Sequence, residues 1–560
     1  MRTRVGVLVG SLLLASSLAV QSQFYYSVNP NDRNTVTVTG YYGTGGSVTI
    51  PTNIGTLAVT GIGTNAFDGT TSLSSITILN SVSSIGQEAF WNCTGLTSVT
   101  ILGSLTNIAY GTFYECGVLA NVSIPDSVTS IEDWAFAYCD KLTSVAIPKD
   151  VTNLGENAFY DCANLADITI PPGVSSIEDY AFAGCGRLTN AIIPFSVTNI
   201  GKYAFSGCGD LRGITIPNGV SNIGVYAFFQ SGLTSVTIPT SITIIGEGVF
   251  SKCADLTSIA IPSSVSSIGV YAFSGSGLTS IAIPIGVNNI QEGVFSECLA
   301  LTNVGISSGV TNIGTGAFEG SGVVSVTIPK SVTSIGDRAF EDCTSMTSVR
   351  ISNSVTNIGI YAFSGSGLKS VAIPGSIVNF GLWAFVDCYG LTNATVEYGV
   401  TSIPAAAFEG CGLLSVTIAG SVTNIGGSAF EGCTALTGLY FTGDAPAADM
   451  TVFGSDNDAI VYYLAGTSGW ILGSPFAGRP ALLWNPVIEI GDGSFGVRSN
   501  QFAFTVTGTA NISVVVQACN DLSNPVWTAV WTGTLTNGSL NFSEAVESNG
   551  TGRFYRITAP

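Results

Sequence analysis

Residues 73–93 read LSSITILNSVSSIGQEAFWNC, and the pattern L-x-x-V-x-I-P-x-S-V-T-x-I-G-x-x-A-F-x-x-C recurs through most of the chain. The phenylalanine of this pattern returns in steps of 23 residues up to Phe228, and in alternating steps of 22 and 23 residues beyond it. Seventeen copies result, at Phe67, Phe90, Phe113, Phe136, Phe159, Phe182, Phe205, Phe228, Phe250, Phe273, Phe295, Phe318, Phe340, Phe363, Phe385, Phe408 and Phe430. Self-similarity at a fixed period predicts a solenoid in which each copy stacks on the next.

Within one copy, the apolar residues predict a short strand and a tight turn. Ile76 and Ile78 stand two apart, which points Thr77 outward from a strand. The segment 82–85 predicts a second short extended piece, and the Gly-x-x-Ala-Phe part suits a single helical turn. One copy cannot bury its apolar side alone, so stacking must supply the core.

The repeat pattern resembles the BspA-like leucine-rich repeats of bacterial surface and secreted proteins. The resemblance covers roughly residues 63–441. It implies a right-handed leucine-rich repeat solenoid, an extracellular location, a role in adhesion or protein binding, and no catalytic residues. We therefore expect a β-rich solenoid of 17 copies of 22–23 residues, with an N-terminal β-hairpin cap and a small C-terminal all-β domain.

The flanks differ from the repeats. Arg2 and Arg4, followed by an apolar run over 5–14, are typical of a secretory signal peptide. No later run approaches the roughly 18 apolar residues of a transmembrane helix. The last segment is a candidate attachment or export module. The expected organisation is a signal peptide over 1–22, a cap over 23–62, the solenoid over 63–441, a closing segment over 442–486 and a β-sandwich-like domain over 487–560.

The composition excludes several function classes. The chain has no histidine, so it offers no Ser-His-Asp triad, no Cys-His pair and no histidine-ligated metal. With 17 basic and 36 acidic residues, it lacks the clustered cations that nucleic-acid binding needs. A regular array offers no deep pocket, and we predict no enzyme, cofactor or metal site. The net charge of −19 is expected to keep the solenoid soluble.

Acidic residues gather before the repeat phenylalanines, as at Glu132 and Asp133. Carboxylates there suit the free N–H groups and the positive end of a turn. Calcium binding is the alternative, because carboxylate oxygens are its preferred ligands.

Twelve of the 13 cysteines stand three residues after a repeat phenylalanine, and Cys519 lies in the C-terminal domain. Between Cys208 and Cys388, every second copy has serine instead, at Ser231, Ser276, Ser321 and Ser366. Cysteines there are two layers apart, about 10 Å, which is beyond disulfide distance. We predict a column of buried free thiols; disulfides between adjacent copies are the alternative for an exported protein.

Two surfaces are candidates for binding. The outward strand positions, such as Thr77, form a flat, hydroxyl-rich face. This face is either a docking surface or a surface whose residues are there only because they suit β-strands. Aromatic residues two before or one after the repeat phenylalanine should align along one edge, where they could bind sugars, anchor a protein or simply pack over the turns. The candidate binding residues are Trp91, Tyr114, Trp134, Tyr160, Tyr180, Tyr203, Tyr226, Phe229 and Tyr271.

These observations predict a secreted or cell-surface protein that binds a protein partner through its extended repeat surface. The first alternative is a carbohydrate-binding protein that uses the aromatic edge. The second is a self-associating structural surface protein.

Overall fold

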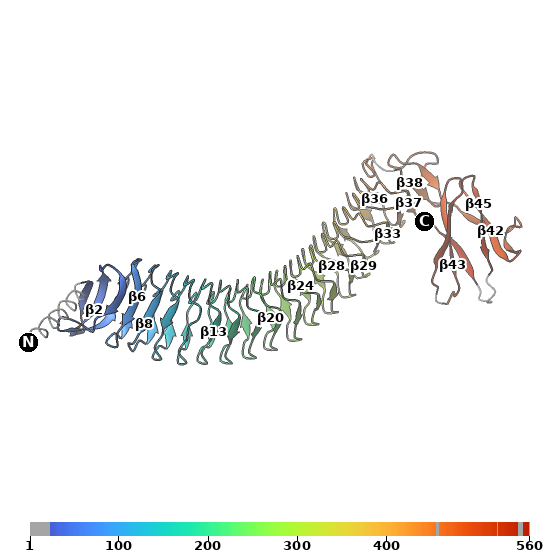
Figure 1. Ribbon diagram of the computed structural model, residues 1–560. Coiled ribbons are helices and arrows are strands. Elements are labelled where there is room, and N and C mark those ends of the chain that lie inside the picture. The colour runs from blue at the N-terminus through green and yellow to red at the C-terminus, as the bar shows by residue number, and fades with distance from the viewer. Residues whose placement is uncertain (1–22, 455–457, 524, 547–552, 559–560) are drawn as a thin grey trace, which may run out of the picture. The chain divides into compact units, whose positions relative to one another are not determined.

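The computed structural model describes residues 23–454, 458–523, 525–546 and 553–558. The predicted signal peptide over 1–22 lies outside the described residues. The chain falls into two compact units, residues 1–309 and 310–560, and both contain stacked solenoid turns (Figure 1). Strands are the only regular elements in the described part of the chain, so no helix there is long and apolar enough to cross a membrane.

The first unit begins with the predicted hairpin cap. Strands β1 (Phe24–Asn29) and β2 (Asp32–Tyr41) pair antiparallel. β3 (Gly46–Ile50) and β4 (Asn53–Ile54) follow, and β5 (Leu57–Ile62) pairs parallel with β2. The cap therefore leads directly into the parallel stacking of the turns.

Two columns of short strands run through the first unit as a series of small sheets, and within each sheet the repeat strands pair parallel and in register. The first column holds β3, β6 (Leu73–Ile78), β8 (Ser98–Ile101), β10 (Asn121–Ser123), β13 (Asp167–Thr169), β15 (Asn190–Ile192), β17 (Gly213–Thr215), β19 (Ser235–Thr237), β21 (Ser258–Ala260), β23 (Ser280–Ala282) and β25 (Asn303–Gly305). The second holds β5, β7 (Ser84–Ile85), β9 (Asn107–Ile108), β11 (Ser130–Ile131), β12 (Asn153–Leu154), β14 (Ser176–Ile177), β16 (Asn199–Ile200), β18 (Asn222–Ile223), β20 (Ile244–Ile245), β22 (Ser267–Ile268) and β24 (Asn289–Ile290).

The second unit has the same two columns. The first holds β27 (Ser325–Thr327), β29 (Ser348–Arg350), β31 (Ser370–Ile373), β33 (Asn393–Val396), β35 (Ser415–Ile418), β37 (Gly438–Phe441), β38 (Ile460–Tyr463) and β39 (Ala481–Leu483). The second holds β26 (Asn312–Ile313), β28 (Ser334–Ile335), β30 (Asn357–Ile358), β32 (Asn379–Phe380), β34 (Ser402–Ile403) and β36 (Asn424–Ile425).

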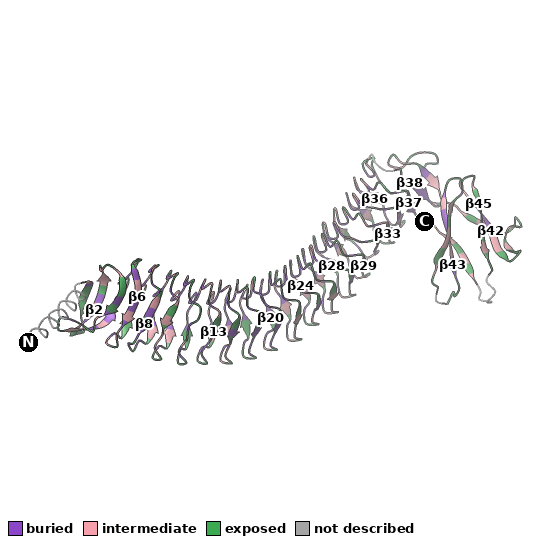
Figure 2. Cartoon of the chain, in the orientation of Figure 1, coloured by how far each residue is buried: buried purple, intermediate pink, exposed green. Residues whose placement is uncertain are grey.

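Repeat phenylalanines form the core of each unit. Phe159 and Phe182 are fully buried, and their rings stack with centroids 5.7 Å apart and an interplanar angle of 5°. In the second unit, Phe363 and Phe385 stack at 5.1 Å and 3°. Along the strands, buried residues alternate with exposed ones, as in the pattern of β13 (Figure 2). The period-two interpretation of the strands is therefore confirmed.

The segment around each repeat phenylalanine is not the helical turn that we predicted. In the first copy, the N–H of Asp68 donates to the carbonyl of Asn65 within the same turn, whereas the N–H of Phe67 donates to the carbonyl of Ala89 in the next turn. An α-helix cannot share its N–H groups in this way, because it uses them within its own segment. Left-handed φ angles, as at Asn65 (57°), break the helical run.

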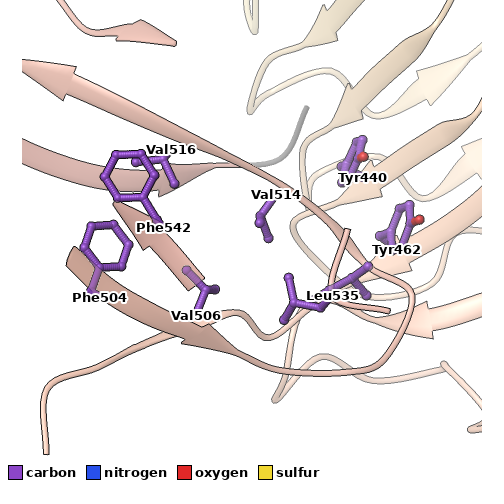
Figure 3. Packing of buried hydrophobic residues seen from close by; sticks show 9 residues of the cluster. Tyr440, Tyr462, Phe504, Val506, Val514, Val516, Leu535 and Phe542 are labelled. Carbon is purple, nitrogen blue, oxygen red and sulfur yellow. The ribbon is translucent and has the colours of Figure 1, made fainter. Parts of the chain in front are cut away.

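A two-sheet antiparallel domain ends the second unit. One sheet consists of β40 (Val487–Glu489), β41 (Gly496–Arg498), β42 (Gln501–Thr507) and β45 (Ser539–Ala545). The other consists of β43 (Ser513–Cys519), β44 (Thr528–Thr534) and β46 (Phe554–Thr558). Tyr440 and Tyr462, from outward positions of β37 and β38, are buried with Phe504, Val514 and neighbouring residues of this domain (Figure 3). The domain thus packs directly on the last solenoid strands.

Candidate functional site

The structure brings eight of the nine predicted aromatic residues into one chain of ring contacts in the first unit. Trp91 stacks on Tyr114 with ring centroids 3.7 Å apart, and Tyr203 stacks on both Tyr180 (4.9 Å) and Tyr226 (5.1 Å). Tilted and edge-on contacts join the remaining members. We call this set the aromatic strip; its members are Trp91, Tyr114, Trp134, Tyr138, Tyr160, Tyr180, Tyr203, Tyr226 and Phe229.

Tyr138 belongs to the strip although the sequence analysis did not select it. Its ring makes edge contacts with Tyr114 and Tyr160, both at 5.3 Å. It stands two residues after the repeat phenylalanine, where other copies carry mostly small or polar residues, so no column of aromatics pointed to it. Tyr271 lies further along the unit, beyond Gly248, which occupies the corresponding position between Tyr226 and Tyr271.

Four strip residues occupy a left-handed backbone position two residues before the repeat phenylalanine. Their φ angles are 61° at Trp134, 58° at Tyr180, 54° at Tyr203 and 56° at Tyr226. This conformation costs an L-residue about 1–2 kcal/mol, and contact between aromatic rings returns about 0.5–1.5 kcal/mol per pair. These residues therefore stabilise the fold through their ring contacts, because the backbone conformation at their positions is better suited to glycine.

Mutual stacking covers both ring faces of Tyr203 in the middle of the Tyr180–Tyr203–Tyr226 series. Tyr203 lies between two nearly parallel rings, at interplanar angles of 7° and 11°. Every strip residue is intermediate between buried and exposed. A partner would therefore meet hydroxyl groups and ring edges along a firm, partly apolar surface.

Carboxylates near the strip cap free backbone N–H groups of neighbouring turns, as the first interpretation of the acidic residues predicted. Asp133 Oδ1 accepts a hydrogen bond from the N–H of Glu156 (2.8 Å), and Asp179 Oδ1 accepts one from the N–H of Lys202 (2.6 Å). Glu132 accepts from the N–H of Tyr110 through its Oε2. Within the described ranges, no group of three Cys, Asp or Glu side chains is placed to hold a metal ion.

The cysteines are buried free thiols, as predicted. Each of the twelve repeat thiols donates to the carbonyl oxygen of a repeat phenylalanine in an earlier turn, as Cys253 does to Phe228 at 3.0 Å. Where serine replaces cysteine, its hydroxyl contacts the next thiol, as in the 3.3 Å contact between Ser231 Oγ and Cys253 Sγ. Burial raises the pKa of Cys253 to about 11, opposed by the Ser231 hydroxyl. Burial therefore keeps the Cys253 thiol protonated and unreactive at neutral pH.

The outward strand face is exposed along most of the solenoid and nearly uncharged. Thr169 and Thr215 are exposed, and Arg350 is the one charged residue among the predicted outward positions. At its C-terminal end this face is covered, because Tyr440 packs into the terminal domain. The face therefore remains a second candidate surface without a feature that selects a ligand.

Comparison with known proteins identifies the family to which the repeats belong. A family model described as BspA type Leucine rich repeat region matches residues 60–189, 175–302, 223–343 and 311–437. No curated protein sequence matches the chain. The chain is similar to the crystal structure of a leucine-rich repeat protein from Bacteroides ovatus, with 26% identity and a TM-score of 0.53 over 75% of this chain and 93% of that chain. A leucine rich cell surface protein from Faecalibacterium prausnitzii is 25% identical with a TM-score of 0.37, over 75% of this chain and 94% of that one.

Proposed function

Because this chain belongs to the BspA type leucine-rich repeat family, we propose that it is a secreted or cell-surface interaction protein, without enzymatic activity, that binds a protein partner along its solenoid. The basic and apolar N-terminal residues, typical of an export signal, support the extracellular location. The regular turns support binding over catalysis, because catalytic sites are concave and irregular.

The observation that carries this proposal is the aromatic strip. Protein interfaces are enriched in tyrosine and tryptophan, which anchor partners at low entropic cost. Tyr180, Tyr203 and Tyr226 hold one another in fixed orientations by stacking, so little side-chain freedom remains to be lost on binding. The strip is thus preorganised for a large partner.

The closed ring faces favour a protein over a glycan. A sugar ring packs on an open aromatic face, and the faces of Tyr203 are occupied by its neighbours. A protein can use the ring edges and the hydroxyl groups along several turns. Glycan binding and self-association are therefore outcomes of the test and not the proposed function.

The test is site-specific photo-crosslinking with the mature chain, residues 23–560. We would place p-benzoylphenylalanine at position 203 in the strip, at position 237 on the strand face and at position 150, an exposed residue outside both surfaces, as the control. Each protein would be exposed to surface proteins from its native environment. We expect protein adducts chiefly at position 203. Equal adducts at all three positions would contradict the proposal, as would binding confined to a glycan array; adducts of the chain with itself would indicate self-association.

A further inference from the structure

The N-terminal half of the aromatic strip carries an unbalanced negative charge. Residues 88–179 contain two basic residues, Lys141 and Lys149, and Lys149 already pairs with Asp150. The same stretch contains twelve acidic residues: Glu88, Glu115, Asp126, Glu132, Asp133, Asp140, Asp150, Glu156, Asp161, Asp167, Glu178 and Asp179.

Later turns of the same unit are better balanced. Arg212 pairs with Asp255, and Lys252 pairs with Glu297 at 3.2 Å. The excess charge is therefore a local property of the turns that carry Trp91, Tyr114, Trp134, Tyr138 and Tyr160.

Most of these carboxylates have no structural task. Glu132, Asp133 and Asp179 cap backbone N–H groups and Asp150 pairs with Lys149, whereas the other eight carboxylates form no ion pair and accept no hydrogen bond within the described part of the chain. Four of the eight stand within three residues of a repeat phenylalanine, as the rings of the strip do: Glu88, Glu115, Glu156 and Asp161. Glu115 and Glu156 are exposed.

The four carboxylates stand beside the rings, and Glu156 lies on the turn whose backbone carbonyl accepts the N–H of Trp134. Side-chain atoms of Glu88 and Trp91 both lie over Gly111, at 3.4 Å and 3.0 Å from the position of an added Cβ. Burial and then the Glu115 carboxylate raise the pKa of Tyr114, and burial, the neighbouring tyrosines and Asp161 raise the pKa of Tyr138, the ring held between Tyr114 and Tyr160. Ring edges and free carboxylates thus share one surface.

The carboxylates at this surface repel one another. Partial burial raises the pKa of the Glu156 carboxyl, and Asp133, Asp179 and Glu178 raise it further, while Lys202 lowers it. Burial and then Asp140 raise the pKa of Asp161. An added cation would relieve this repulsion.

We propose that this acidic part of the strip, formed by Glu88, Glu115, Glu156 and Asp161 with the rings of Trp91, Tyr114, Trp134, Tyr138 and Tyr160, docks a lysine- or arginine-bearing segment of the protein partner. The inference rests on the proposed function and adds the chemistry of the partner. The aliphatic stems of lysine and arginine pack on ring edges while their charged ends reach the carboxylates. Because stacking closes the Trp91 and Tyr114 faces toward each other, the carboxylates hold the cations there, with little cation–π contact.

The length of the surface sets the length of the segment. The five turns from Phe90 to Phe182 span about 19 Å at the strand spacing of a sheet. An extended segment of about six residues covers this distance at roughly 3.3 Å per residue. An eight-residue peptide is therefore a sufficient probe.

The experiment measures peptide binding to the mature chain by fluorescence anisotropy at about 0.15 M salt, where long-range attraction is screened. The probe alternates lysine and alanine over eight residues, and a glutamate–alanine peptide serves as its negative counterpart. The strip variant is E88Q/E115Q/E156Q/D161N. The matched control, D210N/E319Q/D342N/E431Q, removes the same charge from four carboxylates remote in sequence that also lack an ion pair in the described residues. A third variant, Tyr138→Asn, keeps every charge; asparagine adopts the same left-handed φ at Asn92.

We expect the strip variant to weaken binding of the lysine peptide at least about tenfold, the matched control less than about threefold, and Tyr138→Asn several-fold. Equal losses of affinity in both charge variants would show that the peptide is attracted only by the overall negative charge, and would overturn the inference. An unchanged affinity in Tyr138→Asn would overturn it as well. If position 203 yields protein adducts while the lysine peptide does not distinguish the variants, the proposed function stands and this inference fails. If position 203 yields no selective adduct, the proposed function itself fails.

Discussion

The ring of Tyr226 lies over the Cα of Gly248 in the next turn, where a Cβ atom would overlap three atoms of the ring. The Tyr226 hydroxyl donates to Glu247 Oε1 at 3.1 Å, which fixes the ring in this position. Gly248 itself has a φ of 59°. The stacked series Tyr180–Tyr203–Tyr226 therefore ends on backbone, and its last ring face is closed.

Replacing this glycine should displace the ring. We expect Gly248→Ala to destabilise the protein by about 1–3 kcal/mol, because alanine is strained at positive φ and its Cβ overlaps Tyr226. Gly246→Ala is the control, because its Cβ would meet nothing closer than 3.4 Å and its φ is not positive. Urea denaturation compares the two variants; equal midpoints would contradict the packing described for Tyr226.

The left-handed backbone at Tyr203 predicts an unusual order of stability. Tyr203→Ala loses both stacking contacts and keeps the strain, whereas Tyr203→Gly loses the contacts and relieves the strain. We expect the glycine variant to be more stable than the alanine variant by about 1 kcal/mol, measured by urea denaturation. An alanine variant at least as stable as the glycine variant would contradict the strain.

Buried thiols predict a loss of stability at alkaline pH. Burial raises the pKa of Cys253, Cys298 and Cys343 to about 11 in the folded chain, whereas an unfolded thiol ionises near pH 8.5. The folded state then binds more protons than the unfolded state above pH 8.5. The stabilisation is complete below that pH and is lost as pH rises toward 11, by up to about 1.4 kcal/mol per pH unit for each thiol.

Cys253→Ser tests this prediction, because serine occupies the same position in four other copies. We expect the free energy of unfolding of the variant to fall less steeply between pH 8.5 and 10 than that of the unchanged chain. Urea titrations at three pH values in that window provide the slopes. Parallel slopes would show that the Cys253 thiol is not protected by folding.

Removing the contact between the terminal domain and the last solenoid strands should loosen that domain. Tyr440 and Tyr462 are 7% and 3% exposed, and their rings stack at 4.9 Å. Replacing both by threonine, which Thr417 carries at the equivalent outward position, removes two rings from the core of the domain while leaving the strands suited to their sheet. We expect faster proteolysis between residues 487 and 558 and unchanged cleavage within the repeats. Tyr398→Thr, at a residue 81% exposed, is the control and should leave both rates unchanged.

Repetition made much of the fold predictable. The spacing of Phe90, Ile76 and Cys93 recurs in so many copies that the apolar column, the outward threonines and the thiol column follow from it. The aromatic edge was predicted in the same way, because Tyr180, Tyr203 and Tyr226 occupy one position of the repeat.

The remaining features depend on contacts that spacing does not encode. The Gly-x-x-Ala-Phe spacing fits a helical turn, but left-handed residues such as Tyr180 exclude one. A tyrosine in the sequence does not predict a positive φ, because the intrinsic backbone preference of the residue takes no account of ring stacking on the next turn. Tyr440 has the sequence position of an exposed residue, and its burial depends on the terminal domain that covers it.

The pairing of serine with cysteine has a consequence for how the gene can change length. Ser231 with Cys253, Ser276 with Cys298, Ser321 with Cys343 and Ser366 with Cys388 recur every 45 residues, the combined length of one 22-residue and one 23-residue step. Recombination that adds or removes such a block preserves both loop lengths and every serine–cysteine pair. Removing the single turn that carries Cys253 would instead set Ser231 next to Ser276. This part of the protein can therefore be lengthened or shortened without breaking a serine–cysteine contact only by pairs of turns.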